Sequence, residues 1–202
     1  ISLTAVYKLI KNPISRIEVA SAGGYLSYEN IADKATVAGV EVEVRKNLFV
    51  RPLSSAANGM NKLSFGLNGS YIYTNAKMPL ATVTTGSQLE GAAPWIANFD
   101  LSHNFTKGNH SFINTLVLNY VSDKIYTIGT QGYQDIMEQG MMTLDFVSQA
   151  KLNKYVSLTL KARNLLNPSY KLSRKANESG EKVVLSDYKK GINISLGVSC
   201  TF

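Results

Sequence analysis

The 202-residue sequence contains one cysteine and two histidines, and these shortages exclude several kinds of site. A single cysteine, Cys200, cannot form an internal disulfide framework or a cysteine-based zinc site. The two histidines, His103 and His110, flank a short turn-like segment, but no cysteine or carboxylate joins them at metal-ligand spacing. We therefore predict that the chain binds no metal and no cofactor.

Catalytic motifs are also lacking. The sequence has no glycine-rich phosphate loop, no Gly-x-Ser-x-Gly elbow and no recognisable Ser-His-Asp set. Asp100 and Asp145 could form a carboxylate pair only by an accident of the fold, and we expect them to be hydrated carboxylates in a lumen. We therefore predict no catalytic residues and interpret the protein as a non-enzyme.

Long hydrophobic runs are absent. No stretch of 18 apolar residues occurs, so no transmembrane helix is expected. This absence leaves a membrane location open, because barrel strands need only about 9–11 alternating residues each. The chain begins at Ile1 without an initiator methionine or a signal peptide, and we interpret it as the end of a longer chain.

Acidic residues are fewer than basic ones, with 14 Asp and Glu against 21 Lys and Arg and a net charge of +7. Nucleic-acid binding can produce such a balance, but the aromatic residues here are Tyr-rich and lie in alternating segments rather than in basic clusters. We therefore expect no nucleic-acid partner. Basic outer loops that face anionic lipid headgroups are an alternative cause of the charge.

Regular alternation of apolar and polar residues is what the sequence does have. The last twelve residues, 191–202, alternate without a break and end on an aromatic residue. One side of this predicted strand carries Ile192, Ile194, Leu196, Val198, Cys200 and Phe202. The other side is small and polar. Such a strand fits a soluble sandwich facing a core, or a transmembrane β-barrel with lipid on one face and a wet lumen on the other.

Eight segments show this alternation, and the connections between them differ in length. The predicted strands are residues 1–10, 39–45, 63–73, 94–105, 110–121, 142–150, 156–163 and 191–202. Connections after the first, third, fifth and seventh strands are long, and the last of these, 169–190, is a charged loop. The other three are short, and Asn153-Lys154 is expected to be a two-residue turn.

Alternating long and short connections are typical of an up-and-down outer-membrane barrel. A soluble β-sandwich binding module, the alternative, has no reason to place all its long loops at one end. We therefore predict an all-β, antiparallel transmembrane β-barrel in the outer membrane of a Gram-negative bacterium. Lipid offers no partner for Glu41, Asp145 or Arg163, so the polar faces are expected to line a lumen.

Several short motifs follow one another along the chain from about residue 30 onward. They are Asn30 with Lys34-Ala35 and Gly39-Val40-Glu41; Leu89-Glu90-Gly91 with Pro94, Asn98 and Leu101; Leu144-Asp145; Asn164-Leu165-Leu166-Asn167-Pro168 with Tyr170; and the terminal Phe202. In their order and spacing these motifs resemble the C-terminal part of TonB-dependent outer-membrane receptors, particularly the Bacteroidetes type.

The resemblance implies a 22-stranded barrel with an N-terminal plug domain. Residues 1–202 would then be a partial barrel domain, its last eight strands, with the plug absent. Implied partners are outer-membrane lipid and lipopolysaccharide, a TonB-type energy-coupling protein acting through the missing plug, and the barrel-assembly machinery. A surface lipoprotein is a further candidate. The implied function is transport of a nutrient ligand, whether siderophore, corrinoid, glycan or peptide, and the ligand-binding residues are unknown.

The closing strand carries the one motif with a specific task. Ser195, Gly197, Cys200 and Phe202 are similar to the C-terminal signal by which the barrel-assembly machinery recognises its clients. Strand addition is the expected mechanism, in which an exposed edge pairs through main-chain hydrogen bonds.

An alternative function is a self-contained eight-stranded barrel with a structural or adhesion role. The interior of an eight-stranded barrel is just filled by side chains. Small lumen residues such as Gly66, Ser70, Gly197 and Ser199 would fill it poorly, which favours a wider barrel.

Overall fold

The computed structural model describes residues 1–19, 24–30, 32–53, 59–76, 88–130, 132–176 and 180–201. Within these residues all regular structure is β-strand. No helix in these ranges is both long and apolar enough to cross a membrane.

Eight long strands form one antiparallel sheet in the order β1-β4-β5-β6-β7-β10-β11-β14. Their bounds are β1 Ser2–Lys11, β4 Lys34–Leu53, β5 Gly59–Ala76, β6 Trp95–Lys107, β7 His110–Val121, β10 Met141–Lys151, β11 Val156–Arg163 and β14 Asn193–Cys200. The eight predicted strands and their order are thus confirmed. The strand predicted at 39–45 is much longer, because β4 pairs with β5 over nearly its whole length, from Ala35 to Leu53.

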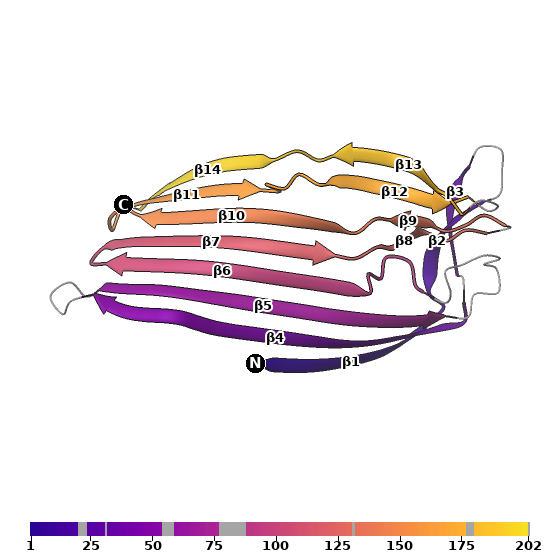
Figure 1. Cartoon of the computed structure of the whole chain (residues 1–202), viewed down its shortest axis with the longest axis horizontal. Coiled ribbons are helices and arrows are strands. Elements are labelled where there is room, and N and C mark those ends of the chain that lie inside the picture. Colours follow the sequence, from indigo (N-terminus) through magenta and orange to yellow (C-terminus); the bar gives the residue numbers. More distant parts are fainter. Residues whose placement is uncertain are drawn as a thin grey trace.

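The sheet is antiparallel as predicted, but it does not close into a barrel. Among the described strands, β1 pairs only with β4 and β14 pairs only with β11, so each end of the sheet has a free edge. Figure 1 shows the eight strands side by side, with the short turns gathered at the left end and the long connections at the right.

The two faces of the sheet differ as the alternation predicts. Register places one apolar row across five strands: Val44, Leu67, Phe99, Leu118 and Leu144. The next row on the opposite face is polar: Glu43, Asn68, Asn98, Asn119 and Thr143. Large apolar side chains are exposed along the first face, which we call the apolar face, and the other is the polar face.

A β-bulge interrupts the pairing of β4 with β5. Register shifts between Asn47 and Phe49, which leaves Leu48 without a partner. Before the bulge the even-numbered residues of β4 lie on the apolar face. After it the odd-numbered residues do, because one extra residue reverses the alternation.

Two of the three short turns lie within the described residues and agree with the sequence in position, whereas residues 54–58 of the turn after β4 lie outside them. Strands β6 and β7 are joined by Gly108 and Asn109, and Gly108 has the positive φ of 58° that such a turn favours. The connection between β10 and β11 spans 152–155 and is therefore longer than the two residues predicted. Asn153 Oδ1 accepts hydrogen bonds from the backbone amides of Tyr155 and Val156, at 2.8 and 2.9 Å, which fixes this longer turn.

Three long connections predicted as loops contain six further strands. These are β2 Ile14–Glu18, β3 Leu26–Asn30, β8 Lys124–Thr127, β9 Ile136–Glu138, β12 Ser169–Lys175 and β13 Lys182–Lys189. The charged loop predicted at 169–190 is thus a hairpin of β12 and β13. An ion pair between Lys171 and Asp187, at 3.2 Å, joins the two strands of this hairpin.

Candidate functional site

The long connections pack together into one structure, which we call the loop body: β2, β3, β8, β9, β12, β13 and residues 88–94. Strands β13-β12-β9-β8 form a four-stranded sheet, and β2-β3 form a hairpin joined to it by the Ile17–Ile128 bridge. Ile17, Ile125 and Ile128 make a buried cluster against which Met137 packs. Long connections that share a hydrophobic cluster hold one another in place, so the loop body has a defined shape.

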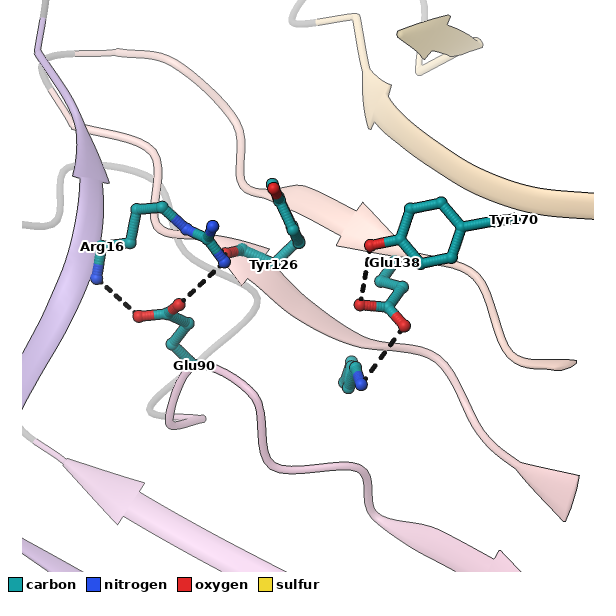
Figure 2. A network of polar contacts seen from close by, with 6 residues as sticks. Arg16, Glu90, Tyr126, Glu138 and Tyr170 are labelled. Carbon is teal, nitrogen blue, oxygen red and sulfur yellow. Dashed lines mark hydrogen bonds and ion pairs between the residues drawn. The ribbon is translucent and has the colours of Figure 1, made fainter. Parts of the chain in front are cut away.

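The four long connections lie, in chain order, between β1 and β4, β5 and β6, β7 and β10, and β11 and β14. Arg16 joins the first three of them. Its guanidinium forms an ion pair with Glu90 at 3.1 Å and lies over the ring of Tyr126, with 3.8 Å to the ring centroid. Two of its N–H groups donate to the Tyr126 carbonyl oxygen at 2.8 and 3.1 Å. Figure 2 shows Arg16 pointing between Glu90 and Tyr126, which come from different connections. A planar, multiply donating guanidinium is suited to this role.

Glu138 joins the third connection to the fourth. Its carboxylate pairs with Lys124 at 3.2 Å and accepts a hydrogen bond from the Tyr170 hydroxyl at 3.2 Å. Burial, and then the negative charge of Glu138, raise the pKa of Tyr170 to about 12. Arg174 pairs with Glu18, which ties the fourth connection to the first. These charged side chains already bind one another, so they set the shape of the loop body.

A cavity of about 390 Å³ opens where the loop body meets the polar face of the sheet. We call it the mouth cavity. Its lining comes from β10, β11, the turn after β11, β12 and the start of β14 with the residues before it. The lining residues are Met141, Thr143, Asp145, Arg163, Asn164, Pro168, Tyr170, Lys190, Gly191 and Asn193. This volume is in the range of small-molecule sites, about 300–1,000 Å³.

Two asparagines build the wall of the mouth cavity. Asn164 and Asn167 have positive φ values of 58° and 45°, a backbone conformation that asparagine tolerates better than most residues. Asn164 Nδ2 donates to the Gly191 carbonyl oxygen at 2.7 Å, and Asn167 Oδ1 accepts from the Gly191 amide at 3.0 Å. The turn after β11 is thereby fastened to the start of the last strand.

Asp145 completes this junction. Its Oδ1 accepts a hydrogen bond from the Asn164 backbone amide at 2.8 Å. Two separate motifs of the family resemblance, Leu144-Asp145 and the segment from Asn164 to Pro168, therefore meet in space. The resemblance pointed to both motifs, but only the structure shows that they contact each other.

Positive charge and hydrogen-bonding groups line the mouth cavity without full internal pairing. Arg163 and Lys190 form no ion pair within the described ranges, although Asp145 lines the same cavity, and the Lys190 Nζ lies 5.1 Å from the Tyr170 ring centroid. Asn164 Oδ1 is buried without a hydrogen-bond partner. Such a lining can hold a polar ligand that carries hydroxyl or anionic groups. Sequence reasoning placed Arg163 in the lumen, but it had no signal for Lys190 beyond a charged segment.

The predicted assembly residues lie away from this cavity, on the edge strand β14. Ser195 lies opposite Lys161 on the polar face, and Cys200 lies opposite Val156 on the apolar face. Gly197 is on the polar face as well, and Phe202 lies outside the described residues. All three described residues are exposed on a strand with one free edge, the geometry that strand addition requires. Their role in assembly stays a prediction.

The two histidines lie in β6 and β7, on either side of the turn at Gly108 and Asn109. The described residues include no group of three or more His, Cys, Asp or Glu that could hold a metal ion. His103 Nε2 instead shares a 2.8 Å hydrogen bond with Asn61 Oδ1 across the strands.

A family model described as TonB dependent receptor-like, beta-barrel matches residues 1–165. The match runs from β1 through β11 and ends within the turn that holds Asn164. No curated protein and no solved structure matches the chain. Members of this family are transport receptors of the Gram-negative outer membrane rather than enzymes. With most of its length matched and an antiparallel sheet that has one apolar and one polar face, the chain belongs to the TonB-dependent receptor-like β-barrel family.

Proposed function

We propose that the chain is the C-terminal wall of an outer-membrane importer of the Bacteroidetes type, which takes up a siderophore, corrinoid, glycan or peptide. Energy comes from a TonB-type coupling protein that acts on a plug domain outside residues 1–202. The observation that supports this proposal most directly is that all four long connections join into one loop body above the mouth cavity. A fixed loop body gives an incoming ligand a pre-formed surface, and binding to a pre-formed surface costs less ordering.

The free edges of β1 and β14 support a wider barrel, of which these are eight of 22 strands. A hydrocarbon environment does not tolerate open sheet edges, so further strands must cover them. A self-contained eight-stranded barrel with an adhesion role would need β1 to pair with β14, and these strands lie at opposite ends of the sheet.

A gene deletion tests the transport proposal. The source bacterium without this gene should fail to grow when one of the four ligand classes is its limiting nutrient. Restoring the gene should restore growth, and restoring it with Arg163→Gln and Lys190→Gln should raise the ligand concentration needed. Lys182→Gln, an exposed position on β13, is the control for loss of a loop charge. Normal growth of the deletion strain on all four limiting nutrients would contradict import.

Surface labelling tests the orientation. Lys182→Cys in the loop body should react with a membrane-impermeant thiol reagent on intact cells, to a greater extent than the parent protein, which already carries Cys200. Asn109→Cys, in the turn between β6 and β7, should react only after the outer membrane is opened. Equal labelling of both positions on intact cells would reject the orientation.

We also propose Ser195, Gly197, Cys200 and Phe202 as the assembly signal read by the barrel-assembly machinery. Deleting Phe202 should lower the amount of receptor in the outer membrane without changing the ligand affinity of what is assembled. Unchanged abundance would remove Phe202 from the signal. A co-purifying surface lipoprotein would identify the further proposed partner.

A further inference from the structure

The net charge of the chain is concentrated at one end of the sheet. The turn half, residues 46–53, 59–62, 101–117, 146–162 and 195–201, holds seven of the 21 Lys and Arg residues and none of the 14 Asp and Glu residues. The remaining 14 basic residues are matched by 14 acidic ones, so the turn half accounts for the whole net charge of +7. The charge therefore does not come from basic outer loops, as one interpretation of the composition required.

Three of these cations lie on the apolar face. Register pairs Lys46 with Phe65, Arg51 with Asn61, and Lys107 with Gly59. Arg51 reaches this face because of the β-bulge at Leu48. None of the three has an acidic partner in the part of the chain that the structure describes.

Polar side chains also interrupt the apolar face in the same place. His103 bonds to Asn61, and Ser148 Oγ donates to Asn114 Oδ1 at 2.7 Å. These residues lie in the two rows nearest Arg51, among the rings of Phe105 and Phe112, whose centroids are 6.5 Å apart. We call the part of the apolar face from the row of Lys46 to the row of Lys107 the cationic zone. These two rows are three rows apart, which corresponds to about 20 Å along a strand. Figure 1 places this zone at the left end, where the short turns lie.

We infer that this zone is a binding surface for acidic phospholipid in the membrane leaflet at the turn end. A molecule bound here must contact the apolar face with an apolar part and place a negatively charged part beside Lys46, Arg51 and Lys107. A phospholipid with acyl chains and an anionic headgroup has that order of properties. Aliphatic stems of lysine and arginine can lie on the apolar face while their charged ends reach the phosphate.

The cation count sets the expected strength. Each lysine or arginine near an anionic leaflet strengthens association about fivefold. Loss of all three should therefore weaken binding of acidic lipid by at least tenfold. The inference needs the sheet to lie in a membrane but not to transport a ligand, so a failed growth assay would leave it standing.

Lipid titration of the natural, full-length gene product in detergent, followed by native mass spectrometry, tests this surface. Phosphatidylglycerol is the acidic probe, and phosphatidylethanolamine is the zwitterionic comparison. Lys46→Gln, Arg51→Gln and Lys107→Gln together should lower phosphatidylglycerol affinity at least tenfold and leave phosphatidylethanolamine affinity within twofold. The matched control is Lys62→Gln, Lys151→Gln and Lys161→Gln, which removes the same charge from the polar face of the turn half.

Equal loss in the two triple variants would overturn the inference, because bulk charge rather than this face would then be responsible. Unchanged phosphatidylglycerol affinity in the apolar-face triple would overturn it too. Dissociation of an oligomer at unchanged lipid affinity would instead identify the face as an interface between copies. Heat-dependent gel mobility shows whether each variant folds. If the triple variant does not fold, the single variants Arg51→Gln and Lys107→Gln replace it, and each should lower phosphatidylglycerol affinity about fivefold.

Discussion

The long sheet and the loop body use hydrophobic residues in opposite ways. On the sheet, Leu196 and Val40 are 71% and 48% exposed, whereas in the loop body Ile125 and Ile128 are 1% and 0% exposed. In outer-membrane receptors of this family lipid surrounds the outside of the barrel, so an exposed apolar face on the sheet is expected. The loop body must build its own hydrophobic cluster, as a small soluble domain does. One chain thus folds its two regions for two solvents.

Charged side chains repeat this contrast. In the loop body, Arg16 and Arg174 each have an oppositely charged partner from another connection, and Glu138 pairs with Lys124 of its own connection. In the turn half of the sheet the basic residues have no acidic residue to pair with. Charge therefore stabilises internal contacts in one region and faces the surroundings in the other.

A charge placed on the apolar face should break the contrast most strongly. Val42→Arg should destabilise the folded receptor in lipid by about 2–4 kcal/mol, because arginine near the bilayer midplane is costly there. Glu43→Ala, the neighbouring position on the polar face, is the control and should change stability little. Urea unfolding in lipid vesicles measures both. Equal stability of the two variants would show that the faces are assigned wrongly.

Substitution of Asn164, at the junction between the sheet and the loop body, should have the next largest effect. Asn164→Ala loses a residue suited to positive φ, at about 1–2 kcal/mol, and the hydrogen bond to Gly191, at about 0.5–1.5 kcal/mol. Asn164→Gly keeps the backbone freedom and should lose only the second contribution. Hydrogen exchange of β12 and β13 measures the effect. If alanine and glycine behave alike, the backbone conformation contributes nothing.

Deleting one methylene should distinguish the two solvents. Ile125→Val in the loop body should cost about 0.5–1.5 kcal/mol of local stability, because the space it leaves is enclosed. Leu196→Val on the apolar face also removes one methylene, but lipid can fill the space, so little loss is expected. Protease sensitivity of the loop body and heat-dependent gel mobility are the measurements. A larger effect at Leu196 would reverse the comparison.

Alkaline pH should give the smallest effect, confined to the loop body. Because the pKa of Tyr170 is about 12 in the folded protein and about 10 in an unfolded chain, folding favours the protonated phenol. Its contribution is fully present below pH 10 and is lost as pH rises from 10 to 12. Proteolysis of the loop body should therefore accelerate in that window. Tyr170→Phe should show a smaller acceleration, and an unchanged profile would mean that other groups cause it.

Much of the long sheet could be predicted because apolar and polar residues alternate along its strands with a period of two. The alternation of segments such as Leu63 to Tyr73, together with the unequal connections, was sufficient for eight strands in the right order. The strand at Lys182–Lys189 was missed because Val183, Val184 and Leu185 are consecutive and show no alternation. The count of 22 strands stays a prediction, because residues 1–202 contain eight strands of the long sheet.

The candidate site was less accessible to prediction. Asn164 and Asn167 were marked by the family resemblance, which singled out the turn but not its bonds to Gly191. Arg16 lies 74 residues from Glu90 and 110 from Tyr126, and no local pattern joins positions so far apart. The mouth cavity depends on such long-range contacts, so it emerged only from the structure.

The β-bulge at Leu48 has a consequence for how this part of the wall can vary. Unbroken alternation would place Val50 on the lipid side near the turn, whereas the extra residue places Arg51 there. A deletion of one residue in this strand would therefore exchange the faces of every position between it and the turn. Length change, without any substitution, is enough to move a positive charge from the membrane to the water-filled interior.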